Sequence, residues 1–283
     1  MHTNDSGRDS QSKSALPPAL AVPPVSSAAA PTLPINLPAL TKRQLQVASC
    51  VALGLSNGDI ARELDLTEQI VKNTVHSLFD RLGVWNRVEL ANYFSQGNSS
   101  EVVEAALKRI ERDRMAEVRR MKILDTASER IFDELASLAA RIFEVPIALV
   151  AFADPERIWF KSCIGLSAAS APREITLCKH TIQQSKVFVV NDASQDERFR
   201  CNPLVTADPK LQFYAAAPIL SADGYALGVV CIVDRVPRKF DPSQLSILQS
   251  LARVAVEQLE VRRQLLEERA DREHRVTSPP AKL

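Results

Sequence analysis

The sequence lacks the local signatures of membrane and secreted proteins. Its 283 residues contain no uninterrupted apolar run of the length that a membrane helix needs, which is about 18 residues. The most apolar early stretch, ALPPALAVPPVSSAAAPTLP, is broken repeatedly by proline. We therefore expect neither a membrane span nor a signal peptide, and we predict a cytoplasmic protein.

Cysteine is scarce, and its spacing forms no C-x-x-C pair. The count is odd, which argues against a zinc site and against a disulfide framework. We predict that each cysteine is a small buried apolar residue: Cys50, Cys163, Cys178, Cys201 and Cys231. A Gly-rich phosphate loop, a metal triad and a Ser-His-Asp pattern are absent too, so we predict no catalytic residue, no metal and no enzyme.

Net charge also carries little information. Thirty-five Lys and Arg against 34 Asp and Glu leave a formal charge of +1, so any nucleic-acid surface must be local. The apolar fraction of 46% is typical of a globular protein, and the chain is long enough for two domains.

The amino-acid composition and the apolar pattern change at several points along the chain. Residues 1–37 are rich in Pro, Ala and Ser and are predicted to be a disordered leader. A helical unit follows over 38–97, then a connecting helix over 98–122. A mixed domain is predicted over 123–266, and 267–283 should hold the end of a helix and a flexible tail.

Residues 40–91 have the apolar period, turns and caps of four short helices. Thr41 can cap the first, Ser56 or Asn57 the second, and Thr67 the third, while Gly54 ends the first. This order of caps and turns indicates a helix-turn-helix. The third helix should place five apolar residues on its inner side: Ile70, Val71, Val75, Leu78 and Leu82.

The outer side of that third helix is polar. Its hydrogen-bonding groups could reach base edges and phosphates, but solvated helices often carry similar residues, so spacing alone leaves the question open. The residues are Gln69, Lys72, Asn73, His76 and Arg81.

The segments LTKRQ, GLSNGDIARELDLTEQIVKNTV and RLGVWNR resemble the LuxR-type (GerE-like) helix-turn-helix of bacterial transcription regulators over the whole unit. The resemblance implies that Lys72, Asn73 and His76 touch bases and nearby phosphates. It also implies that Asn57 and Thr67 approach the DNA backbone, and that 87–93 form a fourth helix that often pairs subunits.

Three positions depart from the family pattern: Gln44, Ile70 and Thr74 stand where Glu, Thr and His are usual. The acidic and basic residues of the unit are also balanced, which predicts modest nonspecific affinity for DNA. A degenerate unit that only mediates dimerisation is the alternative.

The connecting helix is basic, and its apolar period has a gap at Arg114. We interpret its charges as a solvated face in preference to a DNA contact. They are Lys108, Arg109, Arg112, Arg114, Arg119, Arg120 and Lys122.

Beyond it, a helix over 131–143 leads into five strand-like runs, namely IALVAFAD, RIWFKSCIG, KVFVV, QFYAAAPIL and YALGVVCIVD. Asp223-Gly224 predicts a hairpin turn, and the sheet should be largely antiparallel. Asp241-Pro242 opens a final helix whose apolar seam is broken at Arg262. The segments WFKSCIGLS, REITLCKHTI, VVNDASQDERFRCNPLV and FYAAAPILSADGYALGVVCIVDR resemble a GAF domain, a family of small-molecule sensors and dimerisation modules.

Candidate residues for a ligand pocket are Trp159, Cys178, His180, Asp192, Arg198 and Phe213. Most of them have a plainer interpretation. Trp159 fits a core or pocket-wall residue, Cys178 a core thiol and His180 a satisfied helix histidine. Asp192 and Arg198 fit turn capping and pairing with one another. The Cys-Lys-His order does not match bilin attachment, and the cysteine surroundings do not match a free methionine sulfoxide reductase. The GAF ligand, if one exists, is an unidentified small molecule, and no cofactor is identified.

We thus expect a multidomain α and α+β protein. It should be a homodimeric, DNA-binding transcription regulator whose GAF domain modulates binding, with a signal passing through residues 101–123 and with no membrane partner. The alternative is a GAF ligand- or redox-sensing interaction protein with a vestigial helix-turn-helix.

Overall fold

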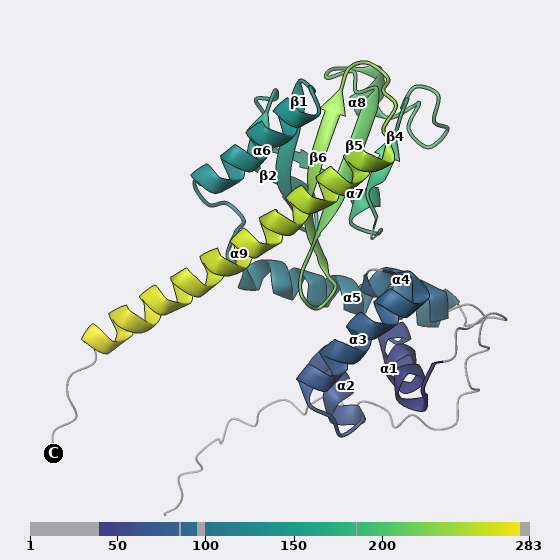
Figure 1. Cartoon of the computed structure of the whole chain (residues 1–283), viewed down its shortest axis with the longest axis vertical. Coiled ribbons are helices and arrows are strands. Elements are labelled where there is room, and N and C mark those ends of the chain that lie inside the picture. Colours follow the sequence, from purple (N-terminus) through teal and green to yellow (C-terminus); the bar gives the residue numbers. More distant parts are fainter. Residues whose placement is uncertain (1–39, 85, 95–99, 185, 278–283) are drawn as a thin grey trace, which may run out of the picture. The chain divides into compact units, whose positions relative to one another are not determined.

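The computed structural model describes residues 40–84, 86–94, 100–184 and 186–277 (Figure 1). The predicted leader over 1–37 and the last six residues of the predicted tail lie outside the described residues. The fold class is the predicted one: an N-terminal helical region is followed by an antiparallel sheet with flanking helices.

Four short helices form the N-terminal region, and each predicted N-cap has the expected geometry. Thr41 and Gln44 cap each other reciprocally, Ser56 and Asp59 do the same, and the side chain of Thr67 accepts from the Ile70 amide. Gly83 ends the third helix in the left-handed conformation, with φ of 64°. The helices are α1 (Lys42–Ala52), α2 (Asn57–Glu63), α3 (Glu68–Leu82) and α4 (Arg87–Phe94).

The core between these helices is apolar, but the predicted inner side of α3 needs one correction. Val71, Val75 and Leu78 are buried, whereas Ile70 is 41% exposed. The period of 3.6 residues places Ile70 at the edge of the buried stripe, on the side of Asn73. The fourth helix is itself well covered, with Arg87, Leu90, Ala91 and Phe94 buried within the chain.

The connecting helix α5 (Ser100–Arg120) explains the gap at Arg114. Arg114 is 4% exposed and donates to the carbonyl oxygen of Ala153 at 2.8 Å, so it is not part of a solvated face. Glu111 pairs with Arg114 and with Arg173. Burial opposes ionisation of Glu111, but hydrogen bonds from the two arginines and their charges lower its pKa to about 2. The helix is thereby anchored to the sheet domain.

The C-terminal domain is built on a six-stranded antiparallel sheet in the order β3-β2-β1-β6-β5-β4. Its hairpin of β5 and β6 closes at the predicted Asp223-Gly224 turn, where Gly224 has φ of 78°. Strand β3 was not predicted, because its three residues, Ser170–Pro172, include no large apolar side chain. The strands are β1 (Ile147–Ala153), β2 (Arg157–Ile164), β3 (Ser170–Pro172), β4 (Phe188–Val190), β5 (Phe213–Leu220) and β6 (Ala226–Asp234).

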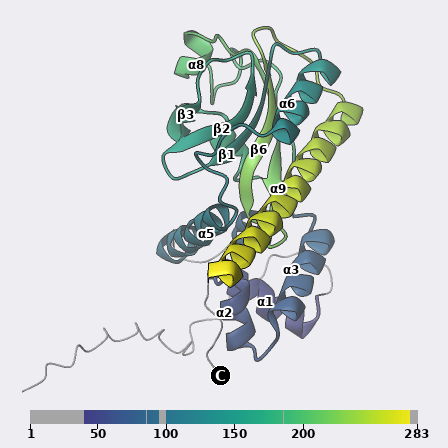
Figure 2. The ribbon, with the colours of Figure 1, turned by 90° about the vertical axis from the view of Figure 1, so that its left-hand side faces the viewer.

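Helices α6 (Arg130–Ile142) and α9 (Pro242–Thr277) lie side by side on one face of the sheet (Figures 1 and 2). The other face is covered by loops and short helices: η1 (Arg173–Ile175), α7 (Cys178–Thr181) and α8 (Pro203–Thr206). The sheet thus separates two apolar clusters, a helix-side cluster and a loop-side cluster.

The last helix begins as predicted, with Asp241 accepting from the amides of Ser243 and Gln244 and Pro242 in the first turn. The break at Arg262 is a polar anchor, because its guanidinium donates to Glu129 at 2.7 Å and to the carbonyl oxygen of Met121 at 3.0 Å. None of the described helices is long and apolar enough to cross a membrane.

Candidate DNA-binding face and ligand cavity

The exposed side of α3 carries the polar residues that the sequence singles out. Gln69 and Asn73 are exposed, and the Gln69 amide donates to the Asn73 side-chain oxygen at 2.9 Å. Lys72 and His76 lie one helical turn apart on the same helix. A helix that leaves such groups exposed over two turns can present them to base edges and phosphates.

Three other predicted DNA-binding residues have structural partners. Arg81 donates to the Gln44 side-chain oxygen at 3.0 Å, which ties the last turn of α3 to α1. Asn57 is 9% exposed, and its side-chain oxygen accepts from Arg87 at 2.7 Å. Thr67 caps α3. These residues therefore hold the unit together, whatever they do in contact with DNA.

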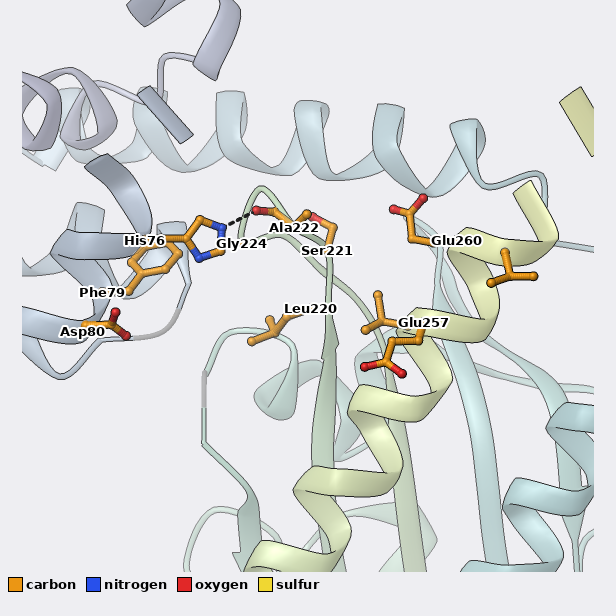
Figure 3. A pocket seen from close by; sticks show the side chains of 11 residues that line it. His76, Phe79, Asp80, Leu220, Ser221, Ala222, Gly224, Glu257 and Glu260 are labelled. Atoms are coloured by element: carbon orange, nitrogen blue, oxygen red, sulfur yellow. Dashed lines mark hydrogen bonds between the residues drawn. The ribbon is translucent and has the colours of Figure 1, made fainter. Parts of the chain in front are cut away.

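The turn of the β5–β6 hairpin lies against this same helix (Figure 3). His76 Nε2 donates to the carbonyl oxygen of Ala222 at 2.6 Å, since a carbonyl can only accept. Asn57 donates to the Asp223 carboxylate at 3.1 Å, and the Lys72 ammonium lies 3.5 Å from the same oxygen. Three of the predicted DNA-binding side chains thus already have partners on the hairpin.

A shallow hollow of about 330 Å³ flanks Asn73 on its other side. Its lining includes residues that the sequence analysis did not assign to DNA, above all the exposed Arg43 and the half-buried Thr74. Arg43 lies beside α3 because α1 packs against α3. The periodicity of a single helix does not show which other helix packs against it. The residues of the hollow are Thr41, Arg43, Gln44, Ile70, Asn73, Thr74 and Ser77.

The loop-side face of the sheet holds a separate cavity of about 280 Å³. Of the six predicted pocket residues, it includes Cys178 alone. Most of its walls are aliphatic, aromatic or thiol groups from β1, β2, β5, β6, α7 and the loops. They include Ile147, Leu149, Phe160, Leu177, Tyr214, Cys231 and Val233.

Trp159 and Phe213 lie on the opposite face, in the helix-side cluster, against the prediction that they line a pocket. Their neighbours Phe160 and Tyr214 line the cavity instead. Successive side chains of a strand point to opposite faces, so a choice that is wrong by one residue exchanges the two sides of the sheet.

The other predicted pocket residues lie outside the cavity lining. His180 packs on Phe188 and Phe199, and Arg198 lies over the same two rings. Arg198 also pairs with Asp196. Asp192 accepts from the amide and hydroxyl of Ser194, which is the turn-capping role considered for it.

Neutral groups dominate the chemistry of the cavity. Burial raises the pKa of Tyr214, whose hydroxyl lies 2.9 Å from that of Thr181. A hydrogen bond with Cys178, together with burial, raises the pKa of Cys231, so this thiol is protonated at neutral pH. Asp208 is the charged residue of this lining. All five cysteines are free thiols. Cys50, Cys178 and Cys231 are buried as predicted, but Cys163 is half-buried and Cys201 is exposed, contrary to the prediction that each is buried.

Comparison with known families agrees with both halves of the structure. Residues 38–94 match the model of bacterial regulatory proteins of the luxR family, and residues 128–259 match the GAF domain model. The chain therefore contains a luxR-family helix-turn-helix domain followed by a GAF domain. Both resemblances drawn from the sequence motifs are confirmed.

Individual relatives share only part of the chain. A cyclic di-GMP phosphodiesterase of Pseudomonas aeruginosa is 37% identical over 147 residues, which are 52% of this chain and 25% of that protein. The chain thus spans about a quarter of that relative.

Solved structures include the GAF domain of an Acinetobacter phosphoenolpyruvate-protein phosphotransferase, at 18% identity and a TM-score of 0.41, covering 53% of this chain and 93% of that one. Another is the free methionine-R-sulfoxide reductase of Neisseria meningitidis in complex with its substrate, at 17% identity and a TM-score of 0.42, covering 58% and 92%.

Proposed function

We propose that this chain is a bacterial transcription regulator that binds double-stranded DNA through α3, as a homodimer, and that its GAF domain modulates the binding. The exposed polar side of α3 within a luxR-family domain carries this proposal. A DNA target places the proposed site of action in the bacterial cytoplasm. The proposed output is binding and not catalysis, and the luxR-family domain is the reason.

Asn73→Ala combined with Gln69→Ala is expected to weaken binding of the target duplex by about tenfold or more, because a side-chain amide on a base edge contributes about 1–3 kcal/mol. Gln69 and Asn73 hydrogen-bond to each other on α3, whereas the hairpin is contacted by Asn57, Lys72 and His76. The duplex would be selected from a random library with the wild-type chain, and its affinity measured by fluorescence anisotropy.

Gln183→Ala is the matched control, because it removes an exposed amide from the GAF domain. It should leave affinity unchanged. A wild-type chain that selects no sequence, or a double variant that binds as tightly as the wild type, would contradict the assignment of α3. A chain that dimerises without binding DNA would instead favour the interaction-protein alternative.

The proposed dimer surface is the outer side of the α6–α9 layer. Exposed apolar residues recur there at spacings of seven and four, which is the pattern of a coiled-coil seam. On α6 they are Ile131, Leu138 and Ile142, and on α9 they are Ile247, Val254, Val261 and Leu265. A twofold pairing of this layer gives each copy the same contacts. Two symmetric copies of α3 then predict an inverted-repeat DNA site.

Val254→Glu combined with Val261→Glu is expected to convert the dimer to a monomer, because it places four carboxylates in an apolar twofold interface. Sedimentation velocity at micromolar concentration checks the mass. Gln264→Glu adds the same type of charge at an exposed position of α9 outside the stripe and should leave the dimer intact. A double variant that still sediments as a dimer would exclude this surface.

A further inference from the structure

The tip of the β5–β6 hairpin, residues 221–224, contacts α3, the proposed DNA-binding helix. It approaches α3 with its backbone and with one charged side chain. The carbonyl of Ala222 accepts from His76, and the carbonyl of Gly224 accepts from the amide of Arg87 at 3.3 Å. The hairpin tip therefore contacts α3 and the start of α4 at once.

Asp223 supplies the charge in this contact. Its carboxylate accepts from Asn57 at 3.1 Å and lies 3.5 Å from the Lys72 ammonium, and both partner side chains of the ion pair are 34% exposed. A DNA phosphate likewise presents an anionic oxygen that amide and ammonium groups of a helix-turn-helix can bind. The carboxylate thus occupies a position suited to a phosphate oxygen.

The turn also makes close steric contact with α3. Gly224 has φ of 78°, which favours glycine, and a Cβ there would lie 2.7 Å from ring carbons of Phe79, so a larger residue would require this ring to shift. Next to it, the Arg87 guanidinium lies over the Tyr225 ring at 5.4 Å. The contact combines hydrogen bonds, an ion pair and steric fit at three consecutive residues of the turn.

The contact is also narrow. Beside it, a hollow of about 640 Å³ lies between α3 and α9, with His76 and Phe79 on one side, Ala222 and Gly224 above, and Glu257 on the other (Figure 3). No residue of α3 belongs to either apolar cluster of the GAF domain, whereas Ala91 of α4 packs in the helix-side cluster.

The hairpin also joins the contact to the ligand cavity. Tyr214 on β5 and Cys231 and Val233 on β6 line that cavity, and the same strands run on to the hairpin tip. Cys231 lies seven positions after Gly224, which in extended backbone corresponds to about 23 Å. The strands are the direct connection between the cavity and α3.

We propose that the hairpin tip at Ala222–Gly224 is an intramolecular competitor of DNA, which occupies Asn57, Lys72 and His76 with a carboxylate and a carbonyl in place of phosphate and base groups. This inference rests on the proposed function, because it needs DNA as the competing ligand. DNA and the hairpin bind the same side chains, so the free chain is a closed form and the DNA complex an open one. The apparent affinity for DNA is then reduced by the fraction of open chains.

Asp223→Asn in the full chain is expected to tighten binding of the selected duplex by about 3- to 10-fold, because it removes the ion pair and weakens the closed form. Glu156→Gln is the matched control, since it removes one exposed carboxylate from the β1–β2 turn. It should change affinity far less than Asp223→Asn. Equal effects of the two variants would show general electrostatic repulsion of DNA and overturn the inference.

A second measurement detects the closed form directly. A water-soluble carbodiimide should join the Lys72 amine to the Asp223 carboxylate in the free chain, and mass spectrometry of the digest should find this cross-link. Saturating duplex should suppress it several-fold. A cross-link that persists at full DNA occupancy, or that never forms, would overturn the inference.

The outcomes separate the two proposals. If wild type and Asp223→Asn bind the duplex equally, the hairpin is not a competitor, while the proposed function stands. If neither binds any duplex, the proposed function fails and the inference fails with it. Binding that appears or tightens only in Asp223→Asn supports both.

Discussion

Gly228→Ala is expected to lower the free energy of unfolding by about 3 kcal/mol, because it forces a methyl group into packed backbone. Gly228 lies in the central strand β6 opposite Phe152 of β1. A Cβ there would lie 2.1 Å from the Ala151 carbonyl oxygen and 2.9 Å from the Phe152 Cα, and neither atom can move without disturbing the sheet. Urea denaturation followed by circular dichroism gives the change.

Gly83→Ala is the control for this substitution. Gly83 is left-handed, with φ of 64°, but no atom lies within 4 Å of its Cβ position. Its replacement should cost about 1 kcal/mol, from backbone strain alone. If the two variants lose equal stability, the close approach of β6 to β1 is not what requires glycine at position 228.

Glu129→Gln is expected to cost about 3 kcal/mol, because it leaves a buried cation without its counterion. The side chain of Lys161 is 0% exposed, and its ammonium donates to Glu129 at 2.7 Å, to the Thr126 hydroxyl at 2.9 Å and to the Ala127 carbonyl at 2.5 Å. Arg262 donates to the same Glu129 oxygen at 2.7 Å. One carboxylate thus ties the segment before α6 to β2 and α9.

Lys161→Met tests whether the charge or the contact matters. Lys161 lies over the rings of Phe132 and Trp159, so a methionine has apolar neighbours in its place. Glu129→Gln with Lys161→Met should therefore be more stable than Glu129→Gln alone, although Arg262 still lacks its acid. If the double variant loses as much free energy of unfolding as the two single variants together, the role of the buried charge is contradicted.

The same group predicts a pH dependence. Burial opposes ionisation of Glu129, but hydrogen bonds and charges of Lys161 and Arg262 lower its pKa below the ordinary value. A carboxyl whose pKa is lower in the folded state stabilises the fold above its unfolded pKa, about 4.3, and this contribution is lost as the pH falls through the folded pKa. The stability difference between wild type and Glu129→Gln should therefore be largest at pH 7 and shrink below pH about 4. A difference independent of pH would contradict this.

Helix ends and the hairpin turn were the most predictable parts of the fold. Thr41, Ser56 and Thr67 each accept a backbone amide three residues ahead, and Asp241 caps α9 in a similar way. Such contacts lie within one turn of the chain, so residue type and order are sufficient to place them.

Breaks in periodicity were visible in the sequence, but their cause was not. Arg114 and Arg262 each interrupt an apolar seam, and each proves to donate to carbonyl oxygens of distant segments, Ala153 and Met121. Helical spacing identifies the face on which an arginine lies, while its acceptor depends on which segment packs there.

The ligand cavity was the least predictable site. Strands β1 and β6 are buried on both faces, so no alternation of polar and apolar residues shows which side chains point to the helices. Phe213 and Tyr214 are both buried, yet they line different clusters. The prediction that Phe213 lines the pocket failed for this reason.

Local chemistry along the chain was thus enough to define the two domains, their caps and turns, and the polar residues of α3. The availability of those polar residues depends on contacts between distant segments. Asp223 lies 166 positions from Asn57 in the chain, yet the fold brings its carboxylate to the amide of Asn57 and near the Lys72 ammonium. A sequence pattern reports what neighbouring residues can do together, whereas packing between distant segments determines which groups are covered, paired or free to bind.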